Sequence, residues 1–169
     1  MSEFSRPLRL ETLGTAPNAR AIDATPGERE ALARRFDLAA LDALDADLTA
    51  QRIAGGVALT GHVRASGAQS CVISGLSVPF AIDEPLTLRF EPAPEGDEIE
   101  LSDADLDILP LEGDTIDLGE AAAQALGLAL DPYPKASELE LAEHRRLLLT
   151  EEAAARAINP FAVLGERTA

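Results

Sequence analysis

The chain has 169 residues, of which 46% are hydrophobic, and its 14 Lys and Arg stand against 30 Asp and Glu, for a net charge of -16. This length favours one domain with tails, and a charge of this sign repels phosphate backbones, so we expect no unaided binding to RNA or to an anionic membrane. The single cysteine, Cys71, excludes an internal disulfide and suits a reducing cytoplasm.

The N-terminal part of the sequence predicts a short strand, a connector and a helix, in that order. Leu8, Leu10 and Thr12 alternate with polar residues, which indicates a strand. Residues 14–24 are typical of a connector. The helix is predicted from Thr25–Glu28 to about Phe36, because this start offers an N-cap, a proline in the first turn and a capping box.

From about residue 43 to residue 90 the apolar pattern changes to a period of two, which predicts β-strands. Turn signals separate the strands at Gly55-Gly56, Ser66-Gly67, Gly75 and Asp83-Glu84-Pro85. Together with the helices, this pattern predicts an α+β fold. Its sheet would be an antiparallel β-meander or partial barrel packed by two or three helices.

An acidic segment follows at about residues 91–117, and we expect most of it to be a loop. It contains no Lys, Arg or His. Its eleven acids are Glu91, Glu95, Asp97, Glu98, Glu100, Asp103, Asp105, Asp107, Glu112, Asp114 and Asp117.

A second helix is predicted from about Leu118 to Leu130, with Asp117 as its N-cap and a proline-rich exit at residues 131–134. We therefore expect a core domain over residues 1–135. A helical tail over residues 136–169 would end in the motif NPFAVL, residues 159–164.

Three motifs in this order resemble the YceD family, the large ribosomal RNA subunit accumulation proteins. They are CVISGLSVPF at residues 71–80, GDTIDLGE at residues 113–120 with the helix and exit that follow, and NPFAVL at residues 159–164. With the N-terminal strand and helix, the resemblance covers most of the chain. Where many members have a second cysteine this chain has Ser74, which puts any zinc site of those relatives in doubt here.

The resemblance implies a non-enzymatic ribosome biogenesis factor that supports synthesis, processing or accumulation of 23S rRNA, without a cofactor. From the negative charge we expect the partner to be a basic ribosomal protein or large-subunit assembly factor, and we expect no direct RNA contact without a protein partner. We expect a monomer or weak dimer.

Two segments are candidate partner-binding sites. The acidic segment would dock a basic protein by electrostatic attraction, and the NPFAVL segment would either insert into a partner or anchor the C-terminus to the sheet. The residues of this hypothesis are Glu95, Asp97, Glu98, Glu100, Asp103, Asp105, Pro160, Phe161, Val163 and Leu164.

The alternative is a small hydrolase or redox enzyme that uses Cys71 or an acidic cleft. Activation of this thiol would need a nearby base, for which His62 on a neighbouring predicted strand is the candidate. A single cysteine on a strand is far more often a small buried hydrophobic residue. We therefore expect no catalytic residues, and no metal site, because Cys71, His62 and His144 are the only N or S ligands.

The sequence also bears on location. The first residues lead into no apolar signal core, and no apolar run approaches the ~20 residues that span a bilayer. We therefore expect a cytoplasmic protein without a membrane segment.

Deleting residues 159–169 distinguishes the two roles of the NPFAVL segment. If Phe161, Val163 and Leu164 anchor the C-terminus, the truncated protein loses their burial and melts at a lower temperature. Unchanged thermal stability with loss of partner binding would instead identify a docking peptide.

Overall fold

The computed structural model describes residues 2–92, 108–111 and 113–147 of the chain. The described residues divide into two compact units, one within Met1–Gln69 and Pro79–Pro132, the other within Ser70–Val78 and Tyr133–Ala169.

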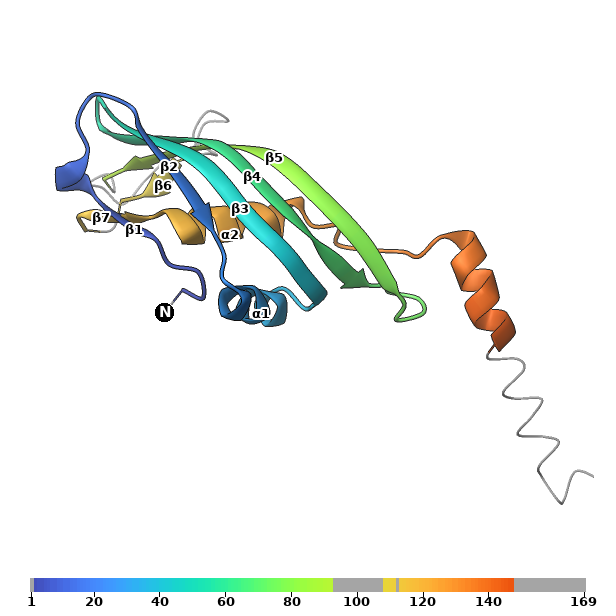
Figure 1. The fold of residues 1–169 in the computed structure, drawn as a ribbon. Helices are drawn as coiled ribbons and strands as arrows, with labels where there is room; N and C mark the ends of the chain where they lie inside the picture. Colours follow the sequence, from blue (N-terminus) through green and yellow to red (C-terminus); the bar gives the residue numbers. More distant parts are fainter. Residues whose placement is uncertain (1, 93–107, 112, 148–169) are drawn as a thin grey trace, which may run out of the picture. The chain divides into compact units, whose positions relative to one another are not determined.

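The larger unit is built on a five-stranded sheet with the strand order β2-β3-β4-β5-β6 (Figure 1). Its strands are β2 (Asn18–Asp23), β3 (Leu38–Ile53), β4 (Gly56–Ser70), β5 (Ser77–Glu91) and β6 (Ile108–Pro110). β2, β3 and β4 pair antiparallel, whereas β6 adds to β5 in parallel. The sheet is not closed, because β2 and β6 are its two edges. The predicted α+β fold with a largely antiparallel sheet is confirmed.

The predicted first strand is shorter than expected. β1 (Pro7–Arg9) pairs antiparallel with β7 (Thr115–Asp117), and the 3-10 turn η1 (Leu10–Thr12) follows it. The hydroxyl of Thr12 donates to the carbonyl of Arg9 at 2.6 Å. This local hydrogen bond favours the turn over continued strand, so the prediction of a strand through Leu10 and Thr12 was wrong.

The predicted connector at residues 14–24 is also corrected, because it contains β2. This strand carries small or polar side chains, and Ile22 is its residue that packs against the core. Because β2 has little apolar alternation, its pairing with β3 stabilises it more than burial of its own side chains does.

Two predicted turns lie inside long strands instead. Ser66-Gly67 is within β4, and Asp83-Glu84-Pro85 is within β5. A Cβ atom on Gly67 would lie 2.3 Å from the carbonyl oxygen of Ala40 on β3. This glycine therefore permits a close approach of two strands and does not mark a turn.

One face of the sheet is covered by two helices and holds the core. Figure 1 shows α1 (Pro26–Arg35) and α2 (Leu118–Ala129) beneath the sheet. Alternate residues of β3 and β4 are buried on that face, and they pack in one cluster with Leu32 of α1 and Leu126 of α2. The strand residues of this cluster include Leu44, Ala46, Leu48, Ala50, Val57, Leu59, Val63 and Ala65.

Both helix starts are as predicted. The Thr25 hydroxyl accepts from the N–H of Glu28, and the Glu28 carboxylate accepts from the N–H of Thr25 at 2.8 Å, so the capping box is complete. The carboxylate of Asp117 accepts from the N–H groups of Gly119 and Glu120 at 3.0 and 3.2 Å.

No helix among the described residues is long and apolar enough to cross a membrane.

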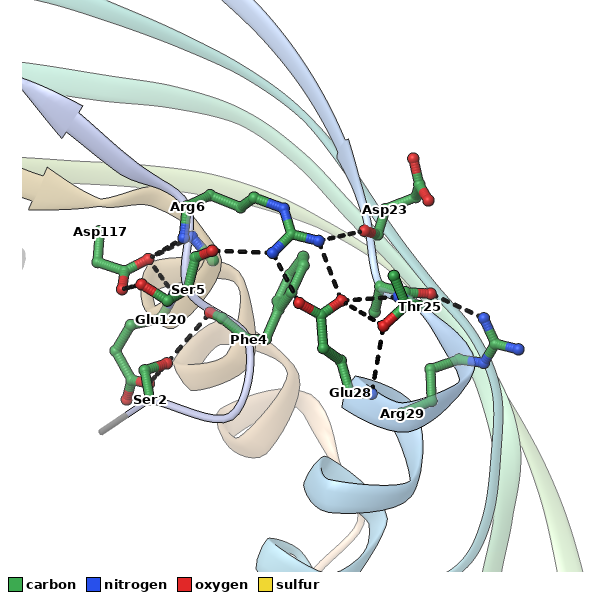
Figure 2. A network of polar contacts seen from close by, with 12 residues as sticks. Ser2, Phe4, Ser5, Arg6, Asp23, Thr25, Glu28, Arg29, Asp117 and Glu120 are labelled. Atoms are coloured by element: carbon green, nitrogen blue, oxygen red, sulfur yellow. Dashed lines mark hydrogen bonds and ion pairs between the residues drawn. The ribbon is translucent and has the colours of Figure 1, made fainter.

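A polar network joins the N-terminal segment to both helices (Figure 2). The Arg6 guanidinium donates two hydrogen bonds to the carboxylate of Glu28, at 2.7 and 3.0 Å. Asp117 accepts from the hydroxyl of Ser5 and from the backbone N–H of Arg6, at 2.6 and 2.7 Å. On α2, Glu120 accepts from Arg35 of α1 at 2.7 Å. The network therefore bonds the N-terminal segment to the first turn of α1 and to the N-cap of α2.

Two carboxylates of this network have strongly lowered pKa values. The hydrogen bonds from Arg6 lower the pKa of Glu28 to about 2, with further help from the capping contacts of Thr25. The hydrogen bonds from Arg35 lower the pKa of Glu120 to about 2, helped by Ser2 and Gln124. Folding therefore favours the ionised form of both groups.

These lowered pKa values predict a loss of stability in acid. The unfolded chain binds protons at Glu28 and Glu120 near their ordinary pKa of 4.5, whereas the folded chain takes them up only near 2. The stabilisation is present above about pH 5 and is lost as the pH falls toward 2. Because the groups are partly exposed, we expect roughly 1 kcal/mol or less from each. Urea unfolding at pH 7 and pH 3 measures this loss.

A matched comparison isolates the two groups from the other carboxylates. Glu28→Gln and Glu120→Gln should lower stability at pH 7 and lose less than the parent between pH 7 and pH 3. Glu11→Gln is the control, because Glu11 is 70% exposed in its ion pair with Arg9. Equal pH dependence in all four proteins would contradict this role of the network.

Candidate interaction site

All ten residues of the partner-binding hypothesis lie outside the described residues. The acidic group falls within residues 93–107, and Pro160, Phe161, Val163 and Leu164 fall within residues 148–169. Their role therefore stays a prediction.

The face of the sheet opposite the core carries charged side chains. Asp45 and Asp47 of β3 alternate with buried core residues and so point to this outer face. Arg64 of β4 donates to both carboxylates, at 2.6 Å to Asp45 and 2.7 Å to Asp47. Beside them, Nδ1 of His62 lies 3.2 Å from a carboxylate oxygen of Asp83 on β5.

These contacts are exposed, so they organise the outer face without stabilising it strongly. Side chains of the Arg64 pairs are 41–61% exposed, and those of His62 and Asp83 are 58% and 65% exposed. Hydrogen bonds from Arg64 to Asp47 and Asp45 raise the pKa of the guanidinium. The positive charge of Arg64 is therefore shared between two acids, and this part of the face presents more acid than base.

The smaller unit contains most of the predicted cysteine motif, whose first residues form a tight turn. The N–H of Cys71 donates to the carbonyl of Leu76, and the N–H of Gly75 donates to the carbonyl of Cys71, at 2.7 and 2.9 Å. Gly75 has φ +71°, a left-handed conformation that favours glycine. The N–H of Val72 donates to the carbonyl of Pro134 at 2.9 Å, which joins the turn to the segment before a helix over residues 138–147.

Hydrogen-bond donors surround the sulfur of Cys71. The N–H of Ala136 donates to Sγ at 3.3 Å. This contact, with the Ser74 hydroxyl and the N–H groups of Ile73 and Ser74, lowers the pKa of the thiol to about 7. The residue is nevertheless only 3% exposed, so the expectation of a buried cysteine is confirmed. The candidate base for this thiol, His62, contacts the carboxylate of Asp83 on β5.

The described residues bring no metal-binding set together. They contain no group of three or more His, Cys, Asp or Glu placed to hold a metal ion. In the Cys71 turn, the hydroxyl oxygen of Ser74 accepts from the backbone N–H of Leu76 at 3.3 Å. Ser74 thus takes part in the hydrogen bonding of the turn.

Sequence reasoning missed one feature, the exposure of Leu128 on α2. Leu118, Ala122 and Leu126 recur at helical spacing and are buried, whereas Leu128 is 90% exposed. Counting positions around the helix would have separated Leu128 from the buried stripe, because residues two apart face different directions. The composition of α2, which is mostly Ala and Leu, does not by itself distinguish the buried positions from the exposed one.

Comparison with known protein families gives one match. The family model described as "Large ribosomal RNA subunit accumulation protein YceD" matches residues 59–166, which is more than half of the chain. No curated protein and no solved structure matches significantly. The matched range includes most of β4, the Cys71 turn, the acidic segment, α2 and the C-terminal motif.

The Cys71 turn predicts a thiol that is ionisable but shielded. At pH 8 a pKa of about 7 leaves most of the thiol ionised, yet its 3% exposure should slow alkylation by iodoacetamide at least about tenfold relative to the urea-unfolded chain. Cys71→Ser should bind partners as the parent does. Native alkylation faster than that of glutathione at the same pH would instead favour the enzyme alternative.

Proposed function

This chain belongs to the YceD family of large ribosomal RNA subunit accumulation proteins, and on that basis we propose that it is a non-enzymatic factor for ribosome biogenesis. It would support synthesis, processing or accumulation of 23S rRNA in the cytoplasm, by binding a basic ribosomal protein or a large-subunit assembly factor. The family match over residues 59–166 is the observation that carries this proposal.

The charge of the chain supports a basic protein as the partner. A net charge of -16 attracts cationic proteins over long distances and accelerates their encounter. The Asp45, Asp47 and Asp83 carboxylates on the outer face of the sheet add to that field.

Direct recognition of rRNA has little support from the arginines. A phosphate-binding surface needs several unneutralised cations on one face. In the cluster of Arg29, Arg34 and Arg35, Arg35 is paired with Glu3 and Glu120, and Arg29 donates to the carbonyl of Ala24. We therefore propose that contact with RNA is made through a protein partner.

Neutralising the acidic segment tests electrostatic docking. The variant Glu95→Gln, Asp97→Asn, Glu98→Gln and Glu100→Gln should associate more slowly at low salt, by about threefold to tenfold, because it weakens the attraction before contact. Association is measured by surface biosensing on immobilised total proteins extracted from large ribosomal subunits. The difference should shrink at 0.5 M salt, where charges are screened.

A second variant with the same change in net charge is the control. Its four substitutions are at exposed acids elsewhere, Glu11→Gln, Glu30→Gln, Glu138→Gln and Glu143→Gln. Equal slowing by both variants would mean that net charge alone matters. Unchanged rates in both would contradict electrostatic docking, and catalytic turnover or tight binding of naked rRNA at physiological salt would contradict the proposed function.

A further inference from the structure

An apolar groove of about 440 Å³ lies in the larger unit between β5 and α2. Leu86 and Leu88 of β5 line one side, and Ala125 and Leu128 of α2 line the other. Its volume is within the range of about 300–1,000 Å³ that is typical of ligand sites, and it is lined mainly by apolar side chains, as such sites are. The groove is thus large enough to receive side chains from another molecule.

Among the described residues, Leu128 has the most exposed of the large hydrophobic side chains. Its side chain is 90% exposed, whereas Leu86 across the groove is 7% exposed and belongs to the core cluster. A single exposed leucine needs no explanation, but here it stands at the rim of an apolar groove whose wall is continuous with the core. Covering Leu128 would remove most of its surface from water.

The charge around the groove indicates what kind of segment would cover it. Glu84 is the one charged residue that lines the groove in the described part of the chain, and no Lys, Arg or His does. Glu84 and the net charge of -16 would repel an acidic segment, whereas they would attract a segment that carries Lys or Arg. Lys and Arg also cover apolar surface with their aliphatic stems while their charges stay in water.

The edge of β5 limits how such a segment can bind. Glu91 directs its carbonyl to the β6 side, where it accepts from the N–H of Leu111 at 2.8 Å. Strand alternation then directs the backbone of Pro79 and Pro85 to the same outer edge, where neither offers an N–H. Addition of a continuous β-strand is therefore interrupted beside the groove, and contact through side chains is favoured.

We propose that the groove between β5 and α2 receives an apolar side chain from a Lys- and Arg-rich segment of a basic partner protein, presented by a helix or a loop. This inference rests on the proposed function, since it names the surface on which the basic partner docks. It adds a specific contact to the general electrostatic attraction.

Leu128→Glu separates the two contributions. General attraction predicts equal or tighter binding to a basic protein, because the substitution adds a negative charge. The groove predicts weaker binding by about tenfold, because the apolar contact is lost. Leu139→Glu is the matched control, since Leu139 is 70% exposed on the helix over residues 138–147 and lies outside the groove. Both variants should melt close to the parent, because both positions are exposed.

Photo-crosslinking identifies the occupant. A benzoylphenylalanine replaces Leu128 in the full chain, and in a control it replaces Thr60, an exposed residue of β4 outside the groove. Each protein is irradiated with total proteins extracted from large ribosomal subunits. We expect crosslinks from position 128, and not from position 60, to a basic protein at an apolar residue flanked by Lys or Arg.

Each other outcome overturns the groove as a partner site. A crosslink from position 128 to the chain's own residues 93–107 would show that the chain covers the groove itself, and a crosslink to a second copy would make it a self-association surface. If the parent binds basic large-subunit proteins while Leu128→Glu binds equally well, the groove inference fails and the proposed function stands. If the parent binds none of them, the proposed function fails and this inference fails with it.

Discussion

The carboxylate of Asp117 is the contact on which the arrangement of the larger unit depends. It accepts from Ser5 and from the backbone of Arg6, and also from the first N–H groups of α2. The side chain of Arg6 continues this connection to Glu28 of α1. One carboxylate therefore connects the N-terminal segment, β7 and α2. Through Arg6, the same hydrogen-bond network also includes Glu28 of α1.

Acidic side chains bind several of the few positive charges of the chain. Arg6 and Arg35 are paired within this network, and Arg64 is paired with acids on the outer face of the sheet, so these arginines act within the fold rather than as a cationic surface. Because acids outnumber basic residues by 30 to 14, such pairing cannot neutralise the negative charge of the chain. A composition with 14 basic residues against 30 acidic ones thus supplies both the ion pairs within the fold and the negative charge of the protein.

Local signals predicted α1 and α2 correctly, and long-range contacts account for what was missed. The capping box at Thr25 and the N-cap at Asp117 depend on neighbours within a few residues, so the sequence contains them in full. β2 is held by its hydrogen bonds with β3, and the need for glycine at position 67 comes from the close approach of Ala40. No local sequence pattern encodes either contact. The groove was missed because it needs β5 and α2 to meet, and the ten predicted binding residues lie outside the described part of the chain.

The pairing of β1 with β7 has a consequence for the order in which a nascent chain can complete this fold. Arg6 and Asp117 are 111 residues apart in the sequence, whereas β3 and β4 form a hairpin between adjacent segments. During translation the hairpin can close early, but the N-terminus must wait until residue 117 has left the exit tunnel. The first residues to be synthesised are thus among the last to find their place, and Phe4, fully buried at the end, stays uncovered through most of elongation.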